Sequence, residues 1–365
     1  MTPRSRLSSL ALIAVLSLVL SSLVVSSPAQ AALQKTRGKV DYGVTSWVAG
    51  TAGYFIKGKA SGAKHRRVAL QIKWADGWHT IDKTKTKRKG KFKIAGTLDW
   101  YGTHELRVSV PRTRRDAAKN FKSMTFTITP SWVPRGDPSS HERYIARGFN
   151  AQWDPCDTIG YRVNPGTAGE AVIPFVQEAV ERLERATGFR TKYLGTTSLV
   201  PTNGKRYPKG TDLVVAWSHQ DVYPDLPPTA VAVGGWFNSH AARRRSNNKV
   251  VWNIKHMSVI VNMANSVYYP LTFDDASVPP LGSVMLHELG HAVGLKHFAD
   301  GIQVMHPTTD RATDATGYHS DYEAGDLAGL QAQGAQGGCL KPYRSRRHGR
   351  SSPADLTDGP GFMSQ

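Results

Sequence analysis

The sequence predicts an α+β protein with two folded units, a β-sandwich followed by a unit of mixed sheet and helices. Short alternating runs separated by turn residues fill residues 33–130. Strand-like and helix-like segments alternate over residues 153–340, and this second unit contains a group of histidines in an apolar segment. A chain of 365 residues is long enough for two units with hydrophobic cores of their own.

Residues 1–31 have the pattern of a secretory signal peptide. Arg4 and Arg6 precede an apolar run, and Ala29 and Ala31 form a small-residue cleavage site. An uncleaved membrane anchor is the alternative, because the run approaches the length that spans a bilayer. The serines of the run and the cleavage site favour export, so we expect a secreted, extracellular protein.

The first unit, residues 33–130, is predicted to be a β-sandwich. Runs such as YFIKGKASG, RRVALQIKW and HELRVSVP alternate apolar and polar residues, and ADG, RKG and YG mark turns between them. The absence of helical periodicity favours packed sheets. The segment VALQIKWADGWHTI resembles the immunoglobulin-like accessory domains of secreted bacterial proteins.

Positive charge is concentrated in this unit. The net charge of the chain is +19, and residues 33–135 contain 23 basic and 6 acidic residues, against 22 of each from residue 136 onward. The run KTKTKRKGKFK indicates either a solvated surface that protects strand edges or a face that binds an anionic cell-envelope polymer or acidic glycan. Nucleic acid is not an expected partner, because no base-reading motif accompanies the run and the chain is predicted to be exported.

Residues 131–152 are rich in Pro, Gly and Ser and are predicted to be a linker. In residues 153–340, the segments DTIGYRVNPG, TDLVVAWS and KHMSVIVNM predict strands. The spacing of apolar residues predicts a helix that stops near Gly188, and SVMLHELGHAVGL and EAGDLAGLQAQ predict two more helices. Residues 341–365 are polar and are predicted to be a disordered tail.

The two cysteines lie near the two ends of the second unit. In an oxidising compartment Cys156 and Cys339 could form a disulfide that joins these ends. Neither belongs to a metal-binding C-x-x-C spacing, and a free thiol is the alternative to the disulfide.

The segment MLHELGHAVGLKH holds three histidines and one glutamate among apolar residues. His287 and His291 are four residues apart, so a helix places them on one face. Gly294 could adopt a left-handed conformation, end the helix and bring His297 back to the other two. Three neutral imidazoles at one point predict a catalytic Zn²⁺ site with an open fourth position, where Glu288 could take a proton from water.

These residues carry a family resemblance. HELGHAVGLKH matches the metzincin signature H-E-x-x-H-x-x-G-x-x-H, so the chain resembles the metzincin zinc peptidases. It is similar to the matrixins in particular, because Met305 follows His297 by eight residues and Asp326 precedes Gly329 by three. The resemblance covers roughly residues 156–340.

The resemblance implies a fold, a site and an activity. It implies a twisted mixed sheet above the active-site and C-terminal helices, with AVAVGGW as the edge strand along which a peptide lies. Met305 would form an apolar floor under the metal, a role close to plain core packing. Asp326 would bond to the turn of Met305, or would instead stabilise the dipole of its own helix. The implied activity is endopeptidase cleavage of a protein or peptide substrate with one zinc ion and Glu288 as general base, and we expect a monomer.

Several matrixin features are missing. His219 and Asp221 match only part of the histidine series that holds a structural zinc, so a second zinc is not expected, and calcium binding has no readable signature. The segment VPRGDP contains no cysteine that could cap the zinc. The rival function is that of a cell-envelope binding protein, in which the basic β-unit binds anionic polymers and the zinc unit is secondary. A third possible function is hydrolysis of other amides, such as peptidoglycan cross-links. The first unit is either a retained binding unit or a prodomain.

Overall fold

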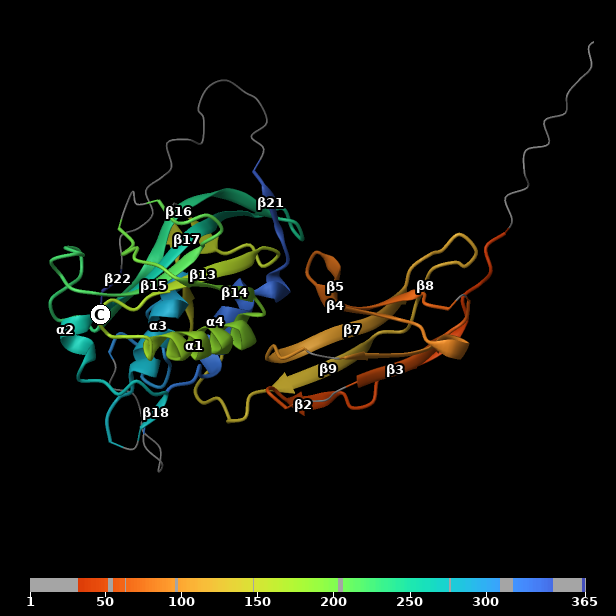
Figure 1. Cartoon of the computed structure of the whole chain (residues 1–365), viewed down its shortest axis with the longest axis horizontal. Coiled ribbons are helices and arrows are strands. Elements are labelled where there is room, and N and C mark those ends of the chain that lie inside the picture. Colours follow the sequence, from red (N-terminus) through yellow and green to blue (C-terminus); the bar gives the residue numbers. More distant parts are fainter. Residues whose placement is uncertain are drawn as a thin grey trace, which may run out of the picture.

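The protein has an α+β fold in a computed structural model that describes residues 32–51, 55–62, 64–95, 98–146, 148–202, 206–275, 277–308, 318–343 and 363–364. Two units follow one another along the longest axis of the molecule (Figure 1). The predicted signal peptide, residues 1–31, lies outside the described residues. Among the residues that are described, no helix combines the length and the apolar character needed to cross a membrane.

The first unit contains two sheets and no α-helix among its described residues. The smaller sheet has the order β1 (Gly38–Asp41), β3 (Phe55–Ala60), β6 (Lys91–Ala95). The larger has the order β2 (Ser46–Val48), β9 (Met124–Thr129), β7 (Gly102–Val110), β4 (Arg67–Trp74), β5 (Gly77–Lys85), and β8 (Lys119–Asn120) pairs with β7.

The two sheets share one hydrophobic core. Alternate residues of β4, such as Val68 and Leu70, are buried, and so are Phe92 and Ile94 of β6. This alternation is the two-residue period of a strand with one buried face. Because both sheets turn their apolar faces to the same core, their outer faces point away from each other.

The second unit is built on a nine-stranded mixed sheet. Its main path is β11 (Ile145–Ala146), β12 (Phe149–Gln152), β17 (Val250–Asn262), β15 (Leu213–Ser218), β13 (Thr158–Asn164), β14 (Arg190–Thr196). β16 (Ala232–Arg244) runs antiparallel to β17, whereas β13, β14, β15 and β17 are parallel to their neighbours on this path. Buried side chains on both faces explain the continuous apolar sequence of β15.

Three helices cover one side of this sheet: α1 (Val172–Thr187), α3 (Leu281–Ala292) and α4 (Ala324–Gln333) (Figure 1). α1 buries Val176, Val180 and Leu183, which lie on one helical stripe, against the main core. It ends at Gly188, whose φ of 71° is left-handed, as predicted from the sequence. The small elements are α2 (Met263–Ser266) and the pairs β10 (Glu142–Arg143) with β19 (Leu295–Lys296) and β18 (Asp274–Asp275) with β20 (Tyr318–His319).

The segment predicted as a linker is part of the second unit. Within residues 131–152, β12 pairs with β17 of the large sheet and β10 pairs with β19. Arg135 forms an ion pair of 2.7 Å with Glu323 at the start of α4. Prolines and glycines in this segment therefore mark turns between short paired strands and not a free spacer.

One short strand lies within the range predicted as a disordered tail, residues 341–365, and another overlaps its start. β21 (Leu340–Pro342) pairs with β16 at Ala242–Arg244, and β22 (Met363–Ser364) pairs with β16 at Val233–Gly234. Both use the side of β16 that does not face β17. Backbone pairing to this edge orders these positions, although their side chains are not apolar enough to predict a strand.

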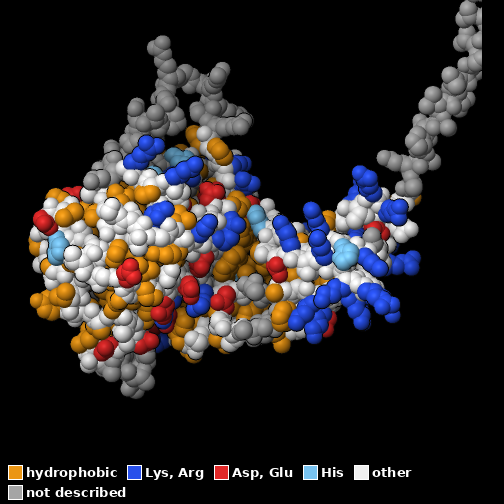
Figure 2. Space-filling model, in the orientation of Figure 1, with side chains coloured by type: hydrophobic (Ala, Val, Ile, Leu, Met, Phe, Trp, Pro, Cys, Tyr) orange, Lys and Arg blue, Asp and Glu red, His pale blue; other side chains and the backbone are white. Residues whose placement is uncertain are grey.

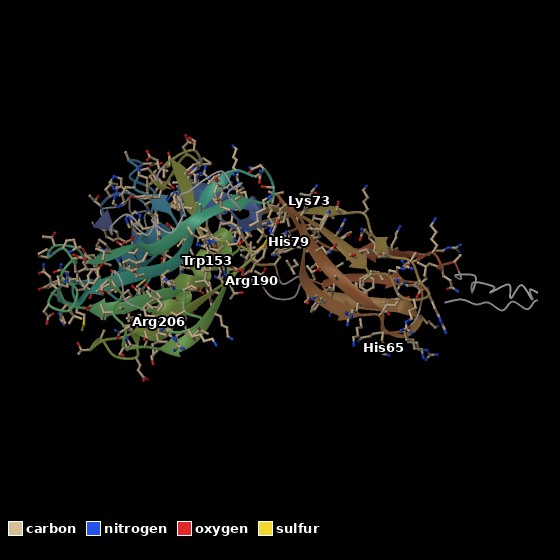
Figure 3. All side chains as sticks on the ribbon, turned by 90° about the horizontal axis from the view of Figure 1, so that it is seen from above. His65, Lys73, His79, Trp153, Arg190 and Arg206 are labelled. Atoms are coloured by element: carbon tan, nitrogen blue, oxygen red, sulfur yellow. A yellow bond between two sulfur atoms is a disulfide. The ribbon has the colours of Figure 1, made fainter. Side chains whose placement is uncertain are left out.

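The two units pack against each other. The N–H of Tyr101 donates to the carbonyl of Arg185 at 2.8 Å, and the Arg185 guanidinium pairs with Asp99 at 3.0 Å. Figure 3 shows His79 and Lys73 at the end of the first unit that meets the second, and His65 at the far end. Lys and Arg side chains gather over the first unit (Figure 2), in agreement with the charge of its sequence.

Candidate metal centre

α3 and the turn after it position three histidines. All twelve residues of α3, Leu281–Ala292, are buried. The helix stops before Gly294, which has a φ of +105°. A Cβ atom on Gly294 would lie 2.7 Å from the carbonyl oxygen of Ala151, so both the conformation and the space require glycine. The chain reverses here, and β19 leads to His297 beside the helix.

The three imidazole rings converge on one point. Nε2 of His297 lies 3.0 Å from Nε2 of His287 and 3.0 Å from Nε2 of His291. His287 and His291 are each 2 % exposed, whereas His297 is half-buried. The cluster is therefore enclosed by the core on one side and accessible from the side of His297.

Backbone carbonyls orient the two buried rings. Nδ1 of His287 donates to the carbonyl of Val304 at 2.7 Å, and Nδ1 of His291 donates to that of Leu295 at 2.9 Å. Because a carbonyl can only accept, both protons sit on Nδ1 and both Nε2 atoms present lone pairs. Burial lowers the pKa of His291 to about 4 and lowers that of His297, which favours neutral rings.

This set of donors fits a zinc ion. Imidazoles whose Nδ1–H groups are held by carbonyls are the usual form of metal-binding histidine. Zinc–nitrogen bonds of about 2.0–2.1 Å in a tetrahedral site place the nitrogens about 3.4 Å apart, near the 3.0 Å found between these Nε2 atoms. A proton on His297 could satisfy only one of its two neighbours, whereas one cation satisfies all three lone pairs.

Glu288 adds a buried carboxyl group next to the first histidine. It is 0 % exposed, and neither of its oxygens has a hydrogen-bond partner among the described residues. Burial raises its pKa to about 8, against a smaller lowering by the nearby N–H of Gly234 on β16. A buried carboxyl without partners costs free energy, and such groups gather at functional sites.

Met305 lies under α3, and Asp326 holds its turn. Met305 is 0 % exposed. The Asp326 carboxylate accepts the N–H of Val304 at 2.7 Å and of Met305 at 3.1 Å. The same carboxylate accepts the N–H of Glu323 at 3.0 Å and closes a capping box at the start of α4. Asp326 thus bonds to the turn of Met305 and also caps the start of its own helix, so the two roles expected as alternatives occur together.

Two buried glutamines, Gln303 and Gln333, support the site, and no sequence pattern predicts them. Oε1 of Gln303 accepts the N–H groups of Gly325 and Asp326 at 2.9 and 3.1 Å. Nε2 of Gln333 donates to the carbonyls of Ala151 and Gly294 at 2.8 and 3.2 Å. Their contacts bind the ends of α4 to the turn of Met305 and to the bend after α3. Nothing in their local sequence separates them from surface glutamines.

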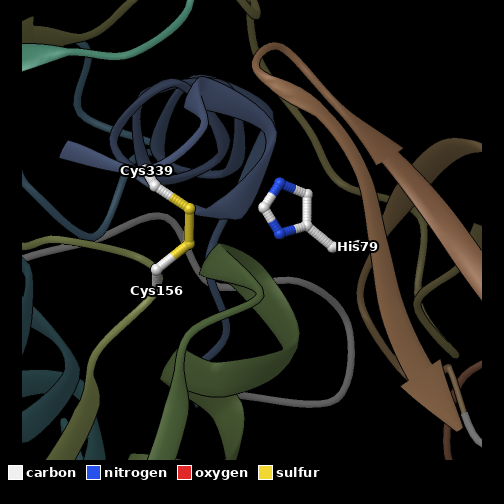
Figure 4. A group of neighbouring side chains, drawn as sticks. All are labelled: His79, Cys156 and Cys339. Carbon is white, nitrogen blue, oxygen red and sulfur yellow. A yellow bond between two sulfur atoms is a disulfide. The ribbon is translucent and has the colours of Figure 1, made fainter. Parts of the chain in front are cut away.

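The predicted cysteine pair lies away from the histidines. Cys156 and Cys339 are joined as a disulfide with a Cα–Cα distance of 5.3 Å (Figure 4). His79 of the first unit lies beside the sulfurs and bonds to Asp76 at 2.8 Å. A cavity of about 790 Å³ opens here between the two units and is lined by Trp74, Trp100 and Glu184 among others. These residues belong to the contact between the units and not to the histidine cluster.

The remaining predicted residues stand apart. His219 and Asp221 are exposed, and neither belongs to a group of three metal-ligating side chains within the described part of the chain. The segment AVAVGGW supplies β16, the strand that lies against α3. A Cβ atom on Gly234 of this strand would lie 2.7 Å from Oε2 of Glu288, so the strand passes directly by the carboxyl group.

Comparison with known proteins does not assign the chain. No protein-family model matches the sequence, and no curated protein is significantly similar to it. Function is therefore argued from the geometry of the histidine cluster and from the residues around it.

Proposed function

We propose that the chain is a secreted zinc-dependent endopeptidase of the metzincin type, similar to the matrixins. The observation that carries the proposal is the convergence of three Nε2 atoms, at 3.0 Å contacts, beside a fully buried carboxyl group. The finer fold assignments, a metzincin-type sheet and an immunoglobulin-like sandwich, belong to the same proposal.

The three histidines act as neutral ligands. His287, His291 and His297 would hold one zinc ion, with Nδ1 of the first two fixed by carbonyls. When bound, zinc supplies a Lewis acid that polarises a peptide carbonyl and acidifies a water molecule. The buried ligands leave the half-buried His297 side open, so the substrate would enter from there.

Glu288 acts as general base and then as general acid. Its carboxylate would take the proton of the attacking water and deliver it to the leaving amine of the cleaved peptide. It follows His287 on a rigid, buried helix, which holds it at a fixed place relative to the histidines. Apart from the nearby N–H of Gly234, no group among the described residues bonds to its oxygens, so they can bond to water and substrate.

A peptide substrate would lie along β16. This strand passes Glu288 at Gly234, and its outer side accepts the backbone of β22 in antiparallel orientation at Val233–Gly234. An extended peptide in this position would form main-chain hydrogen bonds to the sheet and present one of its carbonyls to the histidine cluster. This edge therefore favours extended polypeptide substrates over other amides, such as peptidoglycan cross-links.

The test combines metal analysis with cleavage of casein and of a quenched fluorescent peptide library by the purified full chain. We expect about one zinc per chain and loss of cleavage on chelation. Glu288→Gln should keep zinc and lose roughly 10²- to 10⁴-fold in kcat/KM. His291→Ala should lose both metal and activity, whereas His219→Ala, a matched change at an exposed histidine of the same unit that lies off β16, should keep both.

Two results would overturn the proposal. A purified chain without stoichiometric metal after zinc is supplied would remove the metal site. An unimpaired Glu288→Gln variant would remove the assigned base, even if zinc is bound.

A further inference from the structure

The outer face of the smaller sheet in the first unit carries a regular array of lysines. β3 pairs with β1 on one side and β6 on the other, and the register places Lys59 opposite both Lys39 and Lys91. Lys57 is opposite Lys93 on the same face. We call this array the five-lysine face; its members are Lys39, Lys57, Lys59, Lys91 and Lys93.

All five side chains are exposed, while Ile56 and Ala60 of β3 and Phe92 and Ile94 of β6 belong to the core. None of the five forms an ion pair with an acidic side chain among the described residues. The one acid in register with the face, Asp41, accepts the N–H of Gly43 at 3.0 Å. The face therefore presents five lysines and one carboxylate, a net charge of about +4, with none of the lysines held in an ion pair among the described residues.

A purely structural role does not explain this array. Lysines on edge strands protect a sheet from pairing with other chains, which accounts for the three on β1 and β6 but not for Lys57 and Lys59 on the central strand β3. Like charges directly opposite each other on neighbouring strands lower stability. The outer face of the larger sheet shows the contrast, because there Lys73 is paired with Glu105 at 3.0 Å.

We propose that the five-lysine face binds a linear phosphodiester polymer that carries no bases, such as a polyol phosphate chain. Neighbouring strands are about 4.8 Å apart and alternate residues along a strand about 6.7 Å apart, so the ammonium groups form a grid that a chain of regularly spaced phosphates can follow. Binding would release counterions from the polymer and would weaken as salt rises.

The side chains of the face favour a polymer without bases over nucleic acid. Every cation on the face is a lysine, a point charge that can pair with the phosphates of a flexible chain without a fixed orientation. Single-stranded nucleic acid is bound by aromatic side chains that stack on bases. The aromatic residue at the end of this face, Phe55, is covered by the Lys93 ammonium at 3.3 Å from the ring centre.

The experiment measures binding of poly(glycerol phosphate) to the full chain over a range of salt concentrations. The variant Lys57→Gln/Lys59→Gln removes two charges from the centre of the face. Lys83→Gln/Lys85→Gln is the matched control, because these exposed lysines have the same spacing on β5, at the outer face of the other sheet. Melting temperatures show whether each variant is folded, and Lys59→Gln alone is a milder second variant.

We expect the Lys57/Lys59 variant to bind at least about tenfold more weakly at low salt, with a shallower salt dependence by about 0.7 per lysine, and the control to bind nearly as the native chain does. Its melting temperature should not fall, because opposed like charges are removed. Equal weakening by the control would show a diffuse effect of net charge and would overturn the proposal. Equal or tighter binding of polyglutamate or of an oligothymidylate of equal charge would overturn the assignment to a base-free phosphodiester. Peptide cleavage is measured separately, so neither outcome depends on the zinc site.

Discussion

A Cβ atom on Gly290 would lie 2.4 Å from the sulfur of Met305. The backbone of α3 therefore rests directly on the Met305 side chain, between the two buried histidines of this helix. The same turn supplies the carbonyl of Val304 that orients His287 at 2.7 Å. The turn thus supports α3 through Met305 and orients the His287 imidazole through the Val304 carbonyl.

Gly290→Ala should destabilise the protein by about 1–3 kcal/mol, because the added methyl overpacks the buried contact with Met305. Met305→Ala alone should cost about 2–5 kcal/mol by leaving a cavity. The double variant should lose less stability than the sum of the two single variants. The truncation of Met305 makes room for the methyl added at position 290, and that methyl fills part of the cavity. Urea unfolding of all four proteins measures the cycle, and strict additivity would contradict the contact.

Asp326→Asn should cost about 2–4 kcal/mol and reduce zinc retention. The carboxylate accepts three buried N–H groups, from Val304, Met305 and Glu323, and an amide cannot accept all of them. Asp225→Asn, at an exposed position, is the control and should stay within about 0.5 kcal/mol of the native chain. Unfolding curves and metal content of the two variants are compared with those of the native chain. Equal losses of stability and zinc in both variants would argue against the role assigned to Asp326.

Deletion of residues 344–365 should improve peptide cleavage. The deletion removes β22 from the outer side of β16 at Val233–Gly234, where the substrate is proposed to bind. The loss of competing backbone hydrogen bonds should lower KM by roughly two- to tenfold with little change in kcat. Steady-state kinetics on a fluorescent peptide check this. An unchanged KM would mean that the pairing does not compete with substrate.

Replacement of both cysteines by serine should lower the free energy of unfolding by about 2–5 kcal/mol. Cys156 and Cys339 are 183 residues apart in sequence, so the disulfide restricts a large part of the unfolded chain. The pair lies away from the histidines, so zinc content should stay at the native level. Loss of zinc from the folded double variant would show that the disulfide also shapes the metal site.

His104 should make the stability of the protein fall in acid. It is 5 % exposed, its Nε2–H donates to the carbonyl of Trp100 at 2.8 Å, and burial lowers its pKa below the ordinary 6.5. The unfolded chain then binds a proton that the folded chain resists, so stability is present at high pH and is lost as pH falls through 6.5.

His104→Gln keeps a neutral donor at this position and cannot titrate. The native chain should therefore lose stability relative to this variant between about pH 8 and about pH 5. Chemical unfolding at intervals of pH gives the difference between the two proteins. A constant difference would show that the His104 pKa is ordinary.

The local parts of the site could be predicted from sequence. His287 and His291 share a helix face because of the helical period, and Gly294 adopts the positive φ at which the helix ends. These features depend on residues within a dozen positions of each other. The α+β class also follows from local patterns of alternation, and it is confirmed.

Long-range contacts could not be predicted in this way. Gln333 reaches Gly294 across 39 residues, and β12 enters the sheet beside β17 from a segment that reads as a linker. The run KTKTKRKGKFK is continuous in sequence, yet the chain passes from one sheet to the other within it, at the 3-10 turn Arg88–Gly90. Lys83 and Lys91 therefore end on different faces, which charge counting alone does not reveal.

The packing of the two units sets a geometric limit on what the protein can reach. The carbonyl of Arg185 on α1 accepts the N–H of Tyr101, and the N–H of Ala75 donates to the carbonyl of Gln336 at 3.2 Å, so the first unit is fastened to the helical side of the second. A molecule bound to a polymer through its five-lysine face would hold the histidine cluster at a fixed distance from that polymer. Only polypeptides that reach that distance would be cut, and a longer or looser connection between the units would widen the range of distances.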